Sequence, residues 1–84
     1  MEKSTLLTIG VELFVAINVI AIYHSVQAVR HLNAQLPGAF GEFLKRGPFA
    51  RKEVFSERGW RHRNMAIAIH SLAFFVAAVF IAMS

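Results

Sequence analysis

The sequence predicts an all-α membrane protein: a two-transmembrane-helix hairpin with a basic, aromatic-rich interfacial loop. Two apolar stretches, 5–29 and 65–83, flank a middle segment that holds most of the positive charge. At about 1.5 Å per residue they form helices of about 37 and 28 Å, against a hydrocarbon core about 30 Å thick. Because both lengths suffice to cross a bilayer, a hairpin is the simplest fold for this chain.

The composition excludes several classes of protein. Hydrophobic residues make up 56% of the 84 residues, and a soluble domain of this size buries too little surface to hide them. Lipid or a partner must therefore cover the apolar surface. The chain has no cysteine, which excludes disulfides, thiolate metal sites and cysteine nucleophiles. It also lacks aspartate and any Gly-rich phosphate loop, so we expect no enzymatic activity from the chain by itself, only a non-catalytic place in an enzyme complex.

The first segment, residues 1–32, contains the first spanning helix. Its apolar run is longer than the core of about 7 to 15 residues found in secretory signals, so we expect an anchor. The place of Glu12 depends on how the long helix sits. If the roughly 20 residues nearest the loop fill the hydrocarbon, Glu12 lies at the far headgroup layer. If the helix is shifted or surrounded by another subunit, Glu12 is an intramembrane carboxylate.

The second segment, residues 33–63, is a basic loop that holds seven of the nine Lys and Arg residues, with Arg30 just before it. Short loops rich in Lys and Arg stay on the cytoplasmic side, or on the matrix or stromal side. We therefore expect the loop there and both termini on the opposite side. The expected partners of the loop are anionic lipids and not nucleic acid. The residues expected to contact the membrane surface are Arg30, Lys45, Arg46, Arg51, Lys52, Trp60, Arg61 and Arg63.

Glycines and prolines should divide this loop. We expect Pro37–Gly38, Gly41 and Gly47–Pro48 to break any continuous helix, and Gly59 to mark the turn into the second span. Aromatic rings alternate with the cations, a combination that favours the headgroup layer. The loop is therefore expected to lie along the membrane surface or on a partner protein.

The third segment, residues 64–84, contains the second spanning helix. A strongly polar side chain near the bilayer centre costs on the order of 2.5 to 3.5 kcal/mol, so each one needs a partner or a purpose. With Arg30 and Arg63 taken as the edges, His24 and His70 lie about 9 and 10 Å inside the membrane, at nearly equal depth. A second pair falls at the cytoplasmic interface. This pair consists of His31 and His62.

Small residues share a helix face with both deep histidines, and small residues let helices approach closely in a bilayer. The same space could admit a flat macrocycle with an axial histidine. Asn18 and Ser25, seven residues apart, form a separate polar face that indicates a further protein neighbour. The residues expected in helix packing are Asn18, Ser25, Ala66, Ala73 and Ala77. Three roles stay open for His24 and His70: structural hydrogen bonding, ligation of a tetrapyrrole or metal, and proton transfer.

The stretch from Ala66 to His70 has Ala-x-x-x-His spacing. It resembles the bacteriochlorophyll-binding element of purple bacterial light-harvesting polypeptides. That resemblance implies that His70 ligates the pigment magnesium while Ala66 makes room for the ring. It covers five residues and is not repeated in the first helix, where Ile20 stands four residues before His24. Those polypeptides also cross the membrane once, unlike this chain.

Together these features predict a small accessory or structural subunit of a larger membrane complex. We expect a bioenergetic complex, for electron transfer or light harvesting, in which the chain stabilises a subunit boundary; ligation of a haem or (bacterio)chlorophyll through His24 or His70 is an open further role beside that one. Other membrane protein subunits are the expected partners. The alternative is a homo-oligomeric channel or a holin-like permeabilising hairpin. A pore needs a continuous polar stripe along a span, and the second span has none beyond Ser71.

Overall fold

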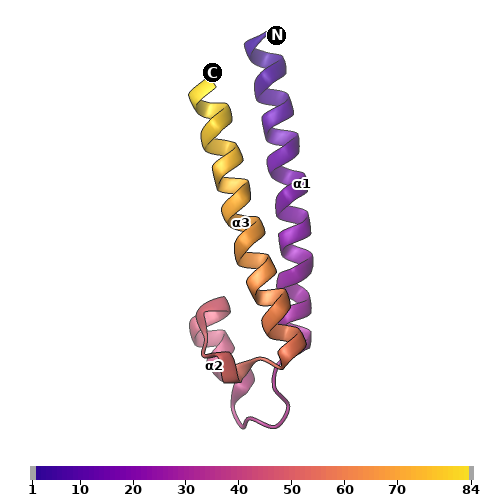
Figure 1. Cartoon of the computed structure of the whole chain (residues 1–84), viewed down its shortest axis with the longest axis vertical. Coiled ribbons are helices and arrows are strands. Elements are labelled where there is room, and N and C mark those ends of the chain that lie inside the picture. The colour runs from indigo at the N-terminus through magenta and orange to yellow at the C-terminus, as the bar shows by residue number, and fades with distance from the viewer. Residues whose placement is uncertain (1, 84) are drawn as a thin grey trace.

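The computed structural model describes residues 2–83 and shows a long helical hairpin with a small folded base (Figure 1). Helix α1 spans Lys3–Arg30 and helix α3 spans Glu57–Met83. The two helices run antiparallel, so the two ends of the chain lie at the same end of the molecule, away from the base. The predicted all-helical hairpin is confirmed.

Both long helices are long and apolar enough to cross a membrane. Only 11% of the most apolar 18-residue window of either helix is buried. The core helix of a soluble domain would be mostly buried, so these two helices do not form such a core. The molecule measures 54 × 16 × 16 Å, the shape of a single pair of helices side by side.

Helices α1 and α3 approach each other through small residues. The buried positions of the two helices are Gly10, Ala21 and Ala28 on α1 and Gly59, Ala66 and Ala73 on α3. Larger side chains fill the spaces between these close contacts: the rings of Phe14 and Phe74 meet edge to face with centroids 6.3 Å apart. Since the hydrophobic effect does not drive association in lipid, such close van der Waals packing is what holds two helices together there.

The segment between the long helices folds back against the base of the hairpin. It contains helix α2 (Ala39–Arg46) and two 3₁₀ turns, η1 (Gly47–Phe49) and η2 (Lys52–Val54). Gly38 before α2 and Gly47 after it both have positive φ angles, 76° and 60°, which favour glycine. The predicted breaks at these positions are confirmed. The predicted break at Gly41 is wrong, because this residue lies inside α2.

An apolar cluster, here called the base cluster, joins this segment to the long helices. Its buried members are Ala28, Ala39, Ala50, Val54 and Phe55, with Leu32, Leu36, Phe43 and Trp60 packed around them. Backbone hydrogen bonds join the residues that follow α1 to the residues that precede α3. For example, the N–H of Asn33 donates to the carbonyl oxygen of Val54 at 2.8 Å. The aromatic residues of the loop thus contribute partly to an internal core.

Helix α3 begins at Glu57, seven residues before the expected start of the third segment at 64. The prediction that Gly59 marks a turn is therefore wrong. Gly59 is buried in the first turn of α3, where an added Cβ would collide with the carbonyl oxygen of His31. Ser56 starts the helix instead. Its hydroxyl donates to His31 O at 2.6 Å and accepts from the N–H of Gly59 at 3.1 Å, as a helix N-cap does.

Candidate functional site

The histidines lie along the interface between α1 and α3, in pairs that differ from the predicted ones. His24 of α1 faces His62 of α3, with their Nδ1 atoms 2.9 Å apart. His70 of α3 instead faces Asn18 of α1, with Nδ1 3.0 Å from Oδ1. The prediction that His24 and His70 lie at nearly equal depth is wrong. Six residues on α1 and eight on α3 separate the two levels, or about 9 to 12 Å along the hairpin.

The error has a clear physical cause. The sequence-based alignment took Arg30 and Arg63 as level, whereas the early start of α3 at Glu57 moves Arg63 more than one helical turn toward the termini. The whole of α3 is shifted in register relative to that expectation. His62 therefore contacts His24 as well as His31, its partner in the predicted interfacial pair.

Three imidazoles gather near the base, and we call His24, His31 and His62 the histidine cluster. The rings of His31 and His62 are stacked, with centroids 6.3 Å apart and planes 15° from parallel. The ring of Tyr23 meets that of His24 edge to face at 5.2 Å. A contact between two Nδ1 atoms needs one donor and one acceptor. One of the two imidazoles is therefore neutral, with its proton on Nε2.

The contact between His70 and Asn18 fixes which ring nitrogen of His70 is the donor. The amide nitrogen of Asn18 donates to the carbonyl oxygen of Phe14 at 2.8 Å, so the amide oxygen is the atom that faces the imidazole. Because an amide oxygen only accepts, Nδ1 of His70 must donate, and a neutral ring then carries its lone pair on Nε2. Metal-ligating histidines are commonly oriented in this way, by a hydrogen bond from the other ring nitrogen.

Asn18 thus has a different neighbour from the predicted one. It contacts α3 of its own hairpin, and the prediction that it faces a separate protein partner is wrong. Ser25 is half-buried and lines a small pocket with residues of the base, including Phe43 and Pro48. Ala66 and Ala73 are buried, and Ala77 is half-buried. Glu12 is exposed on α1 beside Leu7, Thr8 and Val11.

Within residues 2–83, no group of three or more His, Cys, Asp or Glu side chains is placed to hold a metal ion. His24 and His70, the two predicted ligands, do not converge on one point. An axial ligand to a tetrapyrrole needs only one histidine, and the fixed tautomer of His70 suits that role.

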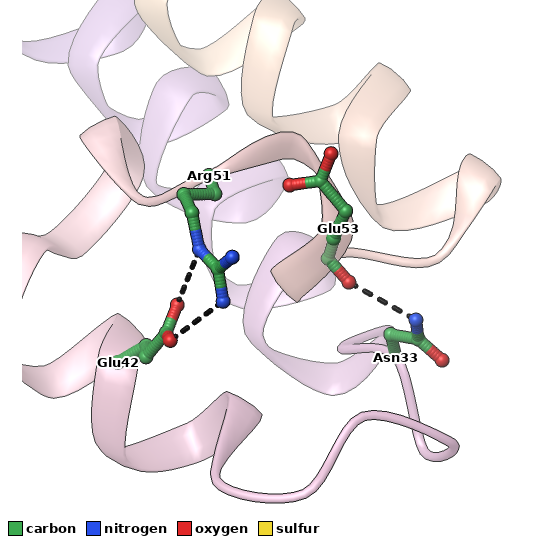
Figure 2. A network of polar contacts seen from close by, with 4 residues as sticks. All are labelled: Asn33, Glu42, Arg51 and Glu53. Atoms are coloured by element: carbon green, nitrogen blue, oxygen red, sulfur yellow. Dashed lines mark hydrogen bonds and ion pairs between the residues drawn. The ribbon is translucent and has the colours of Figure 1, made fainter.

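The cations expected at the membrane surface have several different surroundings. Arg51 forms a bidentate salt bridge with Glu42, with Nη2 2.7 Å from Oε1 and Nε 3.2 Å from Oε2. Figure 2 shows this pair beside the bond from the Asn33 side chain to the carbonyl oxygen of Glu53. The guanidinium of Arg51 holds the pKa of the Glu42 carboxyl below its ordinary value, mainly through this hydrogen bond. The pair links α2 to the segment just before η2.

Other cations of this set bind the base or are exposed. Arg63 donates to the carbonyl oxygen of Pro48 at 2.6 Å and lies over the ring of Trp60, 4.3 Å from its centroid. Lys52 lies 5.9 Å from the same ring. Such cation–π contacts contribute about 0.5 to 1 kcal/mol at exposed sites. The exposed cations of the set include Arg30, Lys45 and Arg46.

Several pockets open on the surface of the described residues, and two of them matter here. The first, here called the basic pocket, has a volume of about 530 Å³ near the base. It is lined by His24, Arg58, Arg61, His62, Asn64 and Met65. The second is apolar, has a volume of about 200 Å³, and lies between the free ends of α1 and α3, beside Phe14 and Phe80.

Sequence reasoning missed two residues that matter for these sites. Ser56 was not identified as the N-cap of α3, although serine is among the residues preferred at that position. Arg58 was counted in the basic loop but not among the contact residues, and it lines the basic pocket. Recognising Ser56 as the helix start would have placed Arg58, Arg61 and His62 on one helix.

Comparisons with known proteins add no family to this description. A scan against protein-family models finds no match, and neither curated proteins nor solved structures give one.

Proposed function

We propose that the chain is an integral membrane hairpin that serves as an accessory subunit of a larger membrane complex. One observation carries the proposal: Asn18 and three histidines of the long helices pair across the hairpin, while many large apolar side chains are exposed on its outer surface. His70 bonds Asn18, and His24 bonds His62. Outward, large side chains such as Val11 and Phe75 are 61% and 67% exposed. Lipid or neighbouring subunits must cover that surface.

The same observation disfavours the pore. A channel needs polar groups that meet water along its whole length, whereas Asn18 and the histidines of α1 and α3 pair across the contact between the helices. In the described part of α3 beyond Ser71, the outward side chains are apolar. The hairpin has the outer surface of a protein that is surrounded by lipid and other helices.

A tetrapyrrole ligand role at His70 is a second, conditional part of the proposal. Asn18 holds Nδ1 of His70, which leaves Nε2 as the nitrogen able to bind iron or magnesium. A bound haem or chlorophyll would supply electron transfer or light absorption, as in a bioenergetic complex. The contribution of this chain is to hold Nδ1 of His70 as a donor to Asn18 and so to orient the ring. His24 is the less suitable ligand, because its Nδ1 shares a hydrogen bond with another titratable ring.

Extraction of the tagged chain from its native membrane in a mild detergent tests both parts. We expect the chain to migrate with other membrane subunits, well above the size of a hairpin. Absorbance in the Soret or near-infrared bands should co-migrate with it, and should be lost in a His70→Leu variant that still enters the membrane. A colourless, uniform homo-oligomer would contradict the subunit proposal and favour the pore. Unchanged absorbance in the variant would exclude His70 as the ligand.

A further inference from the structure

We propose that the basic pocket binds the phosphate group of an anionic phospholipid. The inference rests on the proposed membrane location and deepens it, because it names one lipid site on the hairpin. The pocket has a volume of about 530 Å³ and lies beside the histidine cluster, at the end of the hairpin where the cations gather. Basic pockets between helices on the cytoplasmic or matrix side are suited to anionic lipid headgroups.

The cations of the pocket come from one face of α3. Arg58, Arg61 and Met65 follow one another at helical spacing, so their side chains lie along the same side of the helix. Within residues 2–83, the side chain of Arg58 makes no hydrogen bond or ion pair. Arg61 bonds Glu57 at 3.1 Å, but the two side chains are 75% and 86% exposed. Such an exposed pair contributes little to stability, so Arg61 can exchange the carboxylate for a phosphate.

The chemistry of these groups matches a phosphate diester. Arginine presents a planar fork of N–H donors that fits phosphate oxygens two at a time. The histidine cluster adds a neutral donor: whichever of His24 and His62 accepts at Nδ1 carries its own proton on Nε2. Both rings line the pocket. Asn64 lines it as well, and its amide is bonded by the guanidinium of Arg63 at 2.7 Å.

The apolar side of the pocket points to a lipid as the source of the phosphate. Met65 is 50% exposed and lies on α3 between the arginines and the apolar part of the helix. Leu72, two turns further toward the chain end, is 51% exposed. A phospholipid bound by its phosphate near Arg58 would lay its acyl chains along this apolar surface. Free phosphate would use only the polar half of the pocket.

Lipid binding to the full chain in a neutral detergent tests the inference. Native mass spectrometry would compare phosphatidylglycerol with phosphatidylcholine for the natural chain and for two variants. Arg58→Gln with Arg61→Gln removes two cations from the pocket. The matched control, Lys3→Glu, changes the net charge by the same two units at the opposite end of the hairpin. We expect one phosphatidylglycerol per chain, bound equally by the natural chain and the control and at least tenfold more weakly by the pocket variant.

A second variant and a small-anion titration make the test decisive. Met65→Glu keeps both arginines but places a carboxylate on the pocket wall, and it should also weaken phosphatidylglycerol binding. NMR of the His62 ring during titration with inorganic phosphate should show binding at least tenfold weaker than that of a short-chain phosphatidylglycerol. Equal affinities would overturn the lipid assignment in favour of a small-anion site.

Two further results would overturn the site: equal loss in the pocket variant and the control, or no preference for phosphatidylglycerol over phosphatidylcholine. Extraction of membranes at alkaline pH separates this failure from that of the proposed function. A chain released by that treatment is not integral to the membrane, which removes the proposed function. A chain that resists it but shows no lipid preference removes only the lipid site.

Discussion

Replacing Gly59 with alanine should open the base of the hairpin. An added Cβ at this position would collide with the carbonyl oxygen of His31, and would lie 3.0 Å from its carbonyl carbon. Both are backbone atoms and have no freedom to rotate away. The start of α3 must therefore move away from the end of α1, which stretches the two hydrogen bonds made by the Ser56 hydroxyl.

The cost follows from these contacts. Overpacking of a tight contact costs about 1 to 3 kcal/mol, and each weakened hydrogen bond adds about 0.5 to 1.5 kcal/mol. We expect Gly59→Ala to destabilise the base by about 3 kcal/mol. Gly41 provides the matched control, since nothing lies within 4 Å of a Cβ added there. In the helical interior of α2, Gly41→Ala should stabilise by about 0.5 to 1 kcal/mol.

Trp60 is the single tryptophan of the chain and packs on the base cluster, so its fluorescence reports this region directly. Thermal unfolding in detergent should show a lower Tm for Gly59→Ala and a slightly higher one for Gly41→Ala. The same direction of shift in both variants, or no shift in Gly59→Ala, would refute the close approach of the two backbones at this point.

Three other perturbations test the base and the helix interface. Ser56→Ala removes the N-cap of α3 and should lower the stability seen by tryptophan fluorescence by about 1 to 2 kcal/mol; an unchanged Tm would argue against the cap. Arg51→Gln should raise the pKa of Glu42 in a carbon NMR titration, because the guanidinium holds that pKa down. In the natural chain the contribution of this pair is present above the ordinary pKa of Glu42 and is lost as the pH falls through its lowered value; an identical titration in the variant would contradict the pairing. Asn18→Leu removes the acceptor for the Nδ1–H of His70, so nitrogen NMR should show the proton of the neutral ring shared between Nδ1 and Nε2. A ring still protonated mainly on Nδ1 would mean that another group fixes the tautomer.

The two long helices, unlike α2, were predictable because the apolar character and the length of each can be read from one contiguous stretch of sequence. Neither apolar stretch contains proline, both are long enough to cross a bilayer, and Gly38 and Gly47 stand where the connecting segment changes direction. These are local properties. They survive any error in how one element is placed against another.

The pairing of the histidines was not predictable in this way, because it depends on register. A shift of α3 by a few residues changes the partner of every side chain in the interface. That register is set by contacts between distant segments: the Ser56 hydroxyl on His31 O and the close approach of Gly59. The sequence-based alignment assumed that Arg30 and Arg63 lie at the same depth, and it took no account of these two contacts. The base cluster was missed for a similar reason, since aromatic residues among cations look the same in a headgroup layer and in a small core.

Membrane topology tests the central claim most directly. The absence of natural cysteine allows single-cysteine variants, with Ser4→Cys, Lys45→Cys and Ala82→Cys marking the two ends and the base. In sealed vesicles, a membrane-impermeant maleimide should label position 45 from one side only, and positions 4 and 82 only from the other. Labelling of position 45 and of either end from the same side would contradict the membrane-spanning hairpin.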